Sequence, residues 1–461
     1  MQLDRLDYAA LGTMGLVIAT IVFVVLLGNN VGVQVESYAP RTAVAGSSTI
    51  SIRFYDEMKR DSVEKNFSIE PEVSGKFRWS STREVVFEPD QPLAGGTTYR
   101  VRLKQGAESN NGNAELKDDL EFSFRVNLPK VLYLSPSTSP QRNLMSYNLN
   151  TGEVQQLTDT EFGVADYAIS PDGKLIAYSI YNQDGSADIW LYDVKTGSTR
   201  QLTNCANAFC AAPSWHPDGT RIAYEREDYN SSLGVVGARR IWVVDINSVQ
   251  STTLFQDSQI VGHSPTFSPS GNRIALFSTN PPGIMVYDFV SGESAIIDSM
   301  QGIVGSFSAD GTKLIYPILV RGAMGDTFYT QLEGLEVSGA LSEGRRYRIT
   351  GDPSAPIEDI QGFWNPDGVH IALARRYLDD RYTFGAQIYL LNTETNEVEP
   401  LVYEESYTHG GLEWSPDGNL LVYQRFNHEV SGSKPEIWYY NMTTKESVKV
   451  TDDAFLPGFL P

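Results

Sequence analysis

The chain has 461 residues, a length that predicts two or three structural units instead of one core. Hydrophobic residues make up 41% of it, and 39 glycines, 23 prolines and 24 tyrosines indicate a folded, turn-rich chain built largely from strands, which excludes disorder for its bulk. A formal charge of −21 excludes nucleic acid and anionic lipid surfaces as the main partner, because like charges repel.

The N-terminal segment is expected to anchor the chain in a membrane. No charged residue occurs from Tyr8 to Val35, and residues 9–27 are almost wholly apolar. At about 1.5 Å per residue, such a helix is long enough to cross a hydrocarbon layer about 30 Å thick. A cleaved signal peptide would have a shorter apolar region and basic residues before it. Residues 1–34 are therefore predicted to be a cytoplasmic stub and a transmembrane helix.

Short strands separated by turns are predicted throughout residues 35–127. The candidates are Ser48 to Tyr55, Phe67 to Ile69, Phe77 to Ser80, Glu84 to Glu88, Thr98 to Lys104 and Glu121 to Val126. Turn residues such as Gly95-Gly96 separate them. This many short strands in so few residues predicts a β-sandwich.

The pattern of this segment resembles the bacterial Ig-like domain of envelope and surface-layer proteins. The matching positions are Ile52, Phe54, Met58, Val63, Phe67, Pro71, Gly75, Trp79, Phe87, Pro89, Leu93, Thr98, Tyr99, Val101, Leu103, Phe122 and Phe124. The resemblance implies a spacer or adhesive module.

Residues 128–461 contain six copies of a hairpin in which a strand meets a Pro-Asp-Gly-type turn and a second strand follows. The turns are Ser170 to Gly173, His216 to Gly219, Ser268 to Gly271, Ser308 to Gly311, Asn365 to Gly368 and Ser415 to Gly418. An aspartate before glycine caps its own turn, so these aspartates are interpreted as structural. A third and a fourth strand follow each hairpin, and four antiparallel strands make one blade of a propeller.

The two ends of this region are expected to close the ring. Lys130 to Leu134, Asn143 to Leu149 and Gln155 to Thr158 look like the last three strands of a blade, and Asp453 to Pro461 is predicted to supply its first strand. Joining the ends hides unpaired strand edges. Seven blades follow from this pairing, and six if the tail only docks. The six turn signatures resemble the TolB-like propeller family, related to WD-repeat propellers, which implies a role in protein contacts.

Cys205 and Cys210 are the two cysteines of the chain. In an oxidising compartment their spacing closes a small disulfide loop. Two inert thiols are the alternative, and a zinc site would need two further ligands. The disulfide interpretation agrees with an N-in, C-out topology.

Three arginines occupy equivalent positions of three repeats, namely Arg226, Arg375 and Arg425. Equivalent positions in a propeller share one radius, so the three are expected to form a basic annulus that binds a carboxylate or an acidic peptide. The alternative is that each pairs with a neighbouring acid, such as Glu225 or Glu413.

Further candidate binding residues lie where a propeller gathers ligands around its channel. His263 and His409 precede innermost strands, although a structural role is the alternative for both. Asp166, Asp359 and Glu413 are the acids that a glycan-active site at the channel mouth would use.

The sequence lacks a nucleophile elbow, a zinc-protease helix motif and a phosphate-binding glycine loop. No catalytic residue, metal, cofactor or enzymatic activity is therefore expected. The predicted protein is all-β behind its anchor. It is expected to be a single-pass cell-membrane protein whose extracytoplasmic part is a scaffold that binds another envelope protein, as a subunit of an envelope complex. The alternative hypothesis is a glycan-binding or glycan-active propeller at the cell envelope.

Overall fold

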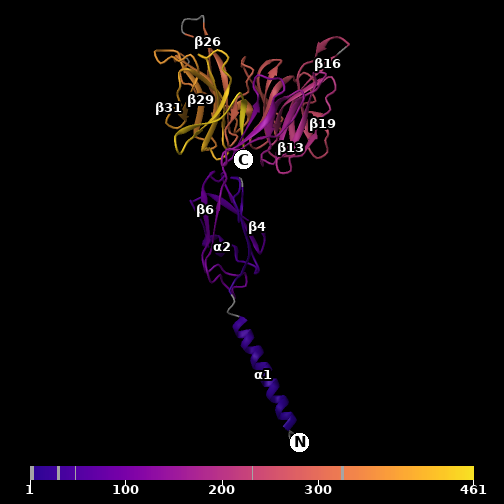
Figure 1. Ribbon diagram of the computed structural model, residues 1–461, viewed down its shortest axis with the longest axis vertical. Helices are drawn as coiled ribbons and strands as arrows, with labels where there is room; N and C mark the ends of the chain where they lie inside the picture. Colours follow the sequence, from indigo (N-terminus) through magenta and orange to yellow (C-terminus); the bar gives the residue numbers. More distant parts are fainter. Residues whose placement is uncertain (1–4, 29–31, 47, 231, 323–326, 353) are drawn as a thin grey trace. The chain divides into compact units, whose positions relative to one another are not determined.

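The computed structural model describes residues 5–28, 32–46, 48–230, 232–322, 327–352 and 354–461, without the side chains of 5–10 and 23–28. The chain divides into two compact units, Met1–Asn127 and Leu128–Pro461. Figure 1 shows a helix and a small β domain in the first unit and a ring of sheets in the second.

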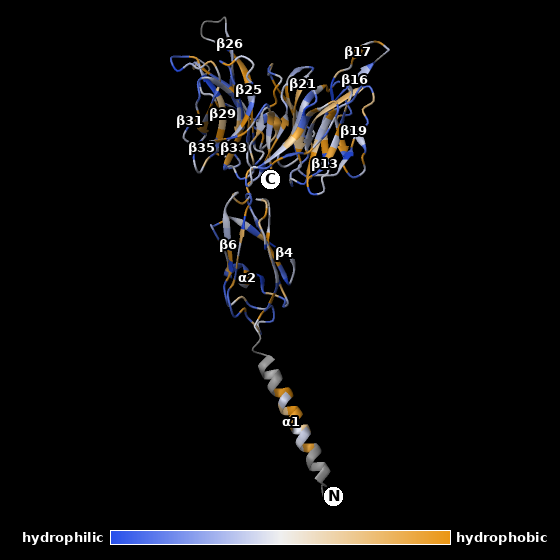
Figure 2. Ribbon diagram, viewed as in Figure 1, coloured by the Kyte–Doolittle hydropathy of each residue, from blue (hydrophilic) through white to orange (hydrophobic). Residues whose placement is uncertain are grey.

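Helix α1 (Arg5–Gly28) opens the first unit. Its described side chains, residues 11–22, are exposed and coloured from white to orange in Figure 2. Among the residues described, no helix is long and apolar enough to cross a membrane. The predicted transmembrane segment is therefore not confirmed, and its ends at 9–10 and 23–27 lie outside the described side chains.

The rest of this unit is a sandwich of two sheets, with strand orders β1-β2-β5-β4 and β3-β6-β7. Its elements are β1 (Val35–Ala39), β2 (Ile50–Phe54), α2 (Arg60–Asn66), β3 (Phe67–Glu70), β4 (Gly75–Ser81), β5 (Glu84–Pro89), β6 (Thr98–Leu103) and β7 (Leu120–Arg125). Alternation along each strand builds the core, because successive side chains point to opposite faces. In β6, Tyr99, Val101 and Leu103 are buried and the residues between them are exposed. They pack with Ile52 of the other sheet in one cluster.

Over the described strands, the second unit is a propeller of seven four-stranded blades, of which blades 2 and 3 belong to one nine-stranded sheet that also includes β17. Blade 1 has the order β10-β9-β8-β36, and each later blade runs in sequence order. Blades 2 and 3 are linked by a single parallel bridge between Ala187 and Phe209.

The bounds of the propeller strands are as follows. Blade 1 contains β36 (Phe455–Leu460), β8 (Lys130–Ser135), β9 (Asn143–Asn148) and β10 (Val154–Gln156); blade 2 contains β11 (Val164–Ile169), β12 (Leu175–Tyr181), β13 (Ala187–Asp193) and β14 (Thr199–Gln201); blade 3 contains β15 (Ala208–Trp215), β16 (Arg221–Asn230), β18 (Arg240–Asp245) and β19 (Ser251–Thr253), with β17 (Val235–Val236) as an extension. Blade 4 contains β20 (Gly262–Phe267), β21 (Arg273–Thr279), β22 (Pro282–Asp288) and β23 (Ser294–Ile297); blade 5 contains β24 (Ser306–Phe307), β25 (Lys313–Arg321), β26 (Phe328–Glu336) and β27 (Arg346–Arg348), with the short helix η1 (Leu341–Glu343). Blade 6 contains β28 (Ile357–Trp364), β29 (His370–Tyr377), β30 (Gln387–Asn392) and β31 (Val398–Val402); blade 7 contains β32 (Tyr407–Trp414), β33 (Leu420–Asn427), β34 (Glu436–Asn441) and β35 (Glu446–Asp452).

The C-terminal strand completes blade 1. β36 pairs antiparallel with β8, where Phe459 lies opposite Val131 and Leu460 opposite Lys130. In Figure 1 the yellow end of the chain accordingly lies beside the first magenta strands of the propeller. Phe459 and Leu460 are buried, so closure adds apolar contacts as well as backbone hydrogen bonds.

The Pro-Asp-Gly-type turns hold themselves together. In the first of them, the Ser170 hydroxyl donates to Asp172 at 2.8 Å, and Gly173 adopts a φ of 68°, which glycine tolerates best. The pKa of Asp172 is below its ordinary value: burial pushes it up, but hydrogen bonds from Lys174 and Ser170 outweigh that effect. This aspartate therefore serves the turn.

Candidate functional site

β-bulges interrupt the innermost strands of several blades. At four of these bulges one residue takes a positive φ: Ala212 (50°) in β15, Ser264 (55°) in β20, Gly411 (57°) in β32 and Leu456 (50°) in β36. A bulge leaves backbone N–H groups without a ladder partner. Such buried groups need another acceptor.

Side chains of the preceding blade supply these acceptors. At three bulges the bonds are Ala212 N–H to Asp166 (2.7 Å), Ser264 N–H to Glu225 (3.2 Å) and Gly411 N–H to Gln361 (3.1 Å). In blade 1 the donor lies just beyond the bulge, where Phe459 N–H bonds Glu413 at 3.0 Å. Two of the predicted acids, Asp166 and Glu413, thus hold neighbouring blades together. Sequence reasoning missed this role of Glu225 and Gln361, although each is a polar residue within an otherwise apolar repeat.

Glu413 lies where β32 faces the C-terminal strand. Glu413 is an exposed residue by its accessible surface, but protein crowds its carboxyl group, and this local desolvation raises the pKa of the carboxyl to about 7. The bond from Phe459 only partly offsets that effect. A Cβ at Gly458 would stand 3.2 Å from Oε2 of Glu413 and 3.0 Å from the Tyr167 hydroxyl, so glycine gives the strand this close approach.

Asp166 and Tyr167 extend the same region from β11. Burial raises the pKa of Asp166 to about 6, and the negative charge of Glu225 adds to the rise, while hydrogen bonds from Ser179 and Ala212 oppose it. The Tyr167 hydroxyl donates to the carbonyl of Leu456 at 2.7 Å. Burial also raises the pKa of Tyr167.

These residues line one cavity of about 430 Å³ between the inner strands of blades 1, 2 and 7. Its walls are Asp166, Tyr167, Ala168, Ile169, Ser170, Glu413, Leu456, Pro457, Phe459 and Pro461. We term it the inner cavity. It combines two carboxyl groups that titrate near neutrality with aromatic and apolar surface, a mixture typical of ligand sites.

Asp359 lies outside the inner cavity. It is fully buried and accepts hydrogen bonds from Arg375 at 2.7 and 2.8 Å and from Thr350 at 2.7 Å. Burial alone would lower the pKa of Arg375, but the Asp359 carboxylate outweighs it and raises that pKa. This pair is a buried structural ion pair, so the structure does not unite the three predicted acids in one site.

The predicted basic annulus does not form, because each arginine is neutralised by an acid of the chain. Arg226 pairs with Asp228 at 2.8 Å, Arg375 with Asp359, and Arg425 with Glu404 at 2.6 Å and Glu436 at 2.7 Å. Arg425 also lies between the rings of Tyr407 and Trp438. The acids differ from the two named in advance: Asp228 lies on the same strand as Arg226, Asp359 and Glu436 lie opposite their arginines on neighbouring strands, and Glu404 lies in the loop before β32.

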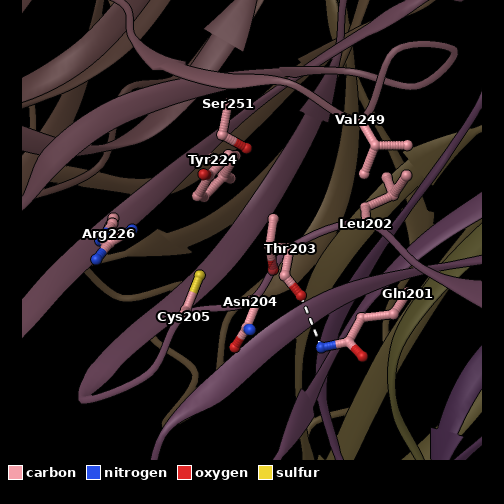
Figure 3. A pocket seen from close by; sticks show the side chains of 9 residues that line it. All are labelled: Gln201, Leu202, Thr203, Asn204, Cys205, Tyr224, Arg226, Val249 and Ser251. Atoms are coloured by element: carbon pink, nitrogen blue, oxygen red, sulfur yellow. Dashed lines mark hydrogen bonds between the residues drawn. The ribbon is translucent and has the colours of Figure 1, made fainter.

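Arg226 lines a second cavity, of about 410 Å³, at the junction of blades 2 and 3. Figure 3 shows Tyr224 and Ser251 beside it, and Gln201 donating to the carbonyl of Thr203 at 2.7 Å. Cys205 also borders this cavity and is joined to Cys210 by a disulfide.

The two predicted histidines have local partners. His409 is buried, its Nδ1 lies 3.0 Å from the carbonyl of Ala386, and burial, with a contribution from Arg425, lowers its pKa to about 4. It is therefore neutral at pH 7. His263 contacts the Ser264 hydroxyl at 2.9 Å. Over the described residues, no three acidic, histidine or cysteine side chains are grouped to hold a metal ion.

Comparison with known proteins identifies part of the chain. Residues 29–126 match the family described as bacterial Ig-like domain. A solved structure of TolB from Acinetobacter baumannii is similar over 93% of this chain and 99% of its own, at 14% identity and a TM-score of 0.44. The expected bacterial Ig-like domain is confirmed by the family match, and the expected propeller fold is confirmed by the order of the sheets themselves.

Two curated relatives are peptidases. Dipeptidyl-peptidase 5 of Porphyromonas endodontalis is 39% identical over 79 residues, which are 15% of this chain and 11% of the relative. Dipeptidyl-peptidase 5 of Porphyromonas gingivalis is 31% identical over 100 residues, 20% of this chain and 14% of the relative. The chain thus matches only a small share of the length of these relatives.

These matches contradict the expectation that the chain is not an enzyme. That expectation rested on motifs missing from the sequence, whereas sequence similarity now relates the chain to peptidases.

Proposed function

We propose that this protein is a membrane-tethered envelope protein whose propeller, related to those of peptidases, takes a polypeptide of another envelope protein in its inner cavity. The Ig-like domain and the TolB-like propeller support an envelope protein-binding role. The Cys205–Cys210 disulfide agrees with an extracytoplasmic location, since disulfides persist in oxidising compartments.

The inner cavity is the observation that carries the proposal. Leu456, Pro457 and Phe459 offer apolar contacts there, while Glu413 and Asp166 offer carboxyl groups for peptide N–H or ammonium groups. The curated relatives are named as dipeptidyl-peptidases, so a polypeptide ligand also agrees with the sequence matches.

Affinity purification of the full chain from detergent-solubilised envelopes tests the proposal. We expect one protein partner in near-stoichiometric amount, lost when Leu456→Asp places a charge in the inner cavity and kept when Val290→Asp changes a distant exposed turn. Aspartate tolerates the positive φ of Leu456, so the first variant should fold. An intact partner indicates binding, and a shortened partner indicates peptidase activity. Equal recovery of the partner with both variants would contradict the assignment of binding to the inner cavity.

Anchoring through residues 9–27 forms part of the proposal and rests on their uninterrupted apolar sequence. Alkaline extraction should leave the full chain in the membrane pellet and release a variant that lacks residues 1–34. Release of the full chain would contradict the anchor.

A glycan-binding or glycan-active propeller is the second candidate. One observation favours it: the carboxyls of Asp166 and Glu413, with pKa values raised to about 6 and about 7, share a cavity with Tyr167. Retention of the chain on peptidoglycan or envelope polysaccharide, with no protein partner, would favour this function.

A further inference from the structure

The connections of the propeller divide between two faces. Successive antiparallel strands reverse direction, so loops joining second to third strands, and fourth strands to the next blade, emerge on one face. We term it the insertion face. The Pro-Asp-Gly-type turns and the turns between third and fourth strands lie on the other, the turn face. Figure 1 agrees, since the ends of β16 and β26 project at the same end of the propeller.

Exposed large apolar side chains are concentrated on the insertion face. Among the described residues its loops and strand ends carry Phe162, Tyr229, Leu233, Val235, Val236, Met300, Ile303, Leu319, Phe328, Tyr382, Phe384, Tyr403 and Val430, whereas the turn face carries Val154, Val249, Phe289 and Val290. Figure 2 shows apolar residues along the strands of the propeller, and many of those strand residues are buried. Exposed apolar groups that gather on one face of a soluble domain mark an interaction surface.

In blades 6 and 7, contacts between neighbouring loops connect one part of this surface. Tyr382 (53% exposed), Phe384 (65%), Tyr403 (47%) and Val430 (55%) come from three neighbouring loops, and we term them the aromatic patch. The ring of Phe384 contacts that of His428 at 4.6 Å, which connects the first loop to the third. His428 Nε2 bonds the carbonyl of Glu405, in the middle loop, at 2.9 Å.

Buried polar groups hold these loops in place. Gln387 is 1% exposed; its amide donates to the carbonyls of Gly385 and Tyr407 and accepts the N–H of Glu404 at 2.7 Å. Arg376 donates to the carbonyl of Phe384 at 3.1 Å. The aromatic side chains are therefore presented by ordered loops, which lowers the entropy cost of binding.

The border of the aromatic patch is acidic, which favours a partner with basic residues. Asp380, Glu405 and Glu429 border it, and no ion pair of theirs is present among the described residues. The nearby cations are already used, since Arg381 pairs with Asp379 and Arg425 with Glu404 and Glu436. Lysine or arginine at the edge of a partner would complement this border.

We propose that the aromatic patch is a docking site for a partner protein that presents an apolar segment flanked by lysine or arginine. This inference rests on the proposed function, because it names a second surface for a protein partner. The patch supplies the central contacts, and the acidic border sets orientation and speeds association.

Site-specific photo-cross-linking in cells that produce the full chain tests the proposal. The photoreactive residue p-benzoylphenylalanine replaces Phe384 in the patch, Phe289 on the turn face (40% exposed) or Leu456 in the inner cavity. We expect position 384 to form an adduct with a different protein, joined through a segment rich in apolar and basic residues. The yield of this adduct should be at least about tenfold above that from position 289, because a central contact of an interface is occupied far more often than a position outside it.

A charge variant provides the second measurement. Asp380→Asn, Glu405→Gln and Glu429→Gln together should lower the yield from position 384 several-fold and leave the melting temperature unchanged, since these groups are exposed. Adducts with a second copy of this chain, an acidic cross-linked segment, or equal yields from positions 384 and 289 would overturn the proposal.

The cavity position separates the two proposals. An adduct from position 456 without one from 384 would overturn the aromatic patch and leave the proposed function standing. No protein adduct from either position would contradict both.

Discussion

At the scale of single residues, the acids around the inner strands differ in charge state because their surroundings differ. Glu413 and Asp166 accept backbone hydrogen bonds in surroundings that disfavour their ionised forms, whereas Asp359 has a buried arginine as its partner. The three acids that the sequence suggests for one channel mouth are therefore expected to respond differently to pH and to substitution.

Glu413 should make stability depend on pH. Its folded pKa of about 7 exceeds the ordinary glutamate value of 4.5, so the folded state favours the protonated carboxyl. The stabilisation that protonated Glu413 gives the folded state is fully present below the pKa of the unfolded chain and is lost as pH rises through the folded pKa. Glu413→Gln keeps the acceptor for Phe459 N–H without a charge. Differential scanning calorimetry should show a melting temperature about 2–4 °C above wild type at pH 8 and no difference at pH 4.

Asp172→Asn is the matched control, because the pKa of Asp172 is lowered and its linkage has the opposite sign. Its contribution is present above the unfolded pKa, so this variant should melt below wild type at pH 8. A fall in melting temperature for Glu413→Gln at pH 8 would refute the assigned direction.

Asp359→Asn should cost about 3–5 kcal/mol of unfolding free energy, because it leaves the buried Arg375 guanidinium without its charge partner. Asp359→Leu combined with Arg375→Met should lose less, since both charges are removed together. The solvent-exposed pair Asp379–Arg381 is the control, and Asp379→Asn should leave the urea midpoint close to that of wild type. Urea titration measures all three; equal losses from the two single substitutions would contradict the role of burial.

At the scale of elements, β36 links the two ends of the propeller. It pairs with β8, accepts the Tyr167 hydroxyl at the Leu456 carbonyl and donates from Phe459 to Glu413. One strand thus connects blades 1, 2 and 7. It therefore contributes more to the stability of the propeller than its pairing with β8 alone would give.

Removal of residues 455–461 should expose β8 as an unpaired edge and open the inner cavity. We expect a fall in melting temperature of about 10 °C or more and concentration-dependent self-association, because free edges pair with other chains. A synthetic peptide of residues 454–461 should restore the monomer by strand addition. Light scattering measures this, with Leu456→Ser as a control that keeps the strand. A truncated chain that stays monomeric and equally stable would contradict the closure role.

At the scale of the whole molecule, the two units have separate cores. The sandwich core draws on residues 33–126 alone, and the propeller clusters draw on residues of its own blades. Each unit should therefore fold without the other.

Calorimetry of the chain from residue 35 onward should show two unfolding transitions. Deleting residues 35–127 from it should remove one transition and leave the other within about 2 °C, since a domain with its own core melts independently. A single transition, or a large shift of the remaining one, would show that the units stabilise each other.

Much of the fold follows from local sequence, and the candidate site much less. The Pro-Asp-Gly-type repeats predict the blades, and the tail was predicted to pair with the strand that contains Val131, as β36 does with β8. Asp166 and Glu413 were singled out as acids of the channel mouth, but their roles as acceptors for the next blade depend on bulges that periodicity does not show. The repeat predicts equivalent positions for the three arginines, yet their acidic partners differ from blade to blade: Asp228 is on the same strand as Arg226, Asp359 and Glu436 are on neighbouring strands, and Glu404 is in a loop.

The sequence by itself determined the order of units, the blades and the turns, because alternation and turn chemistry act between near neighbours in the chain. Only the tertiary structure decided which charges are neutralised, which carboxyls have raised pKa values and which apolar side chains share a face. Those properties depend on groups far apart in sequence, as Glu413 and Phe459 or Tyr167 and Leu456 illustrate, and on the water that their approach excludes.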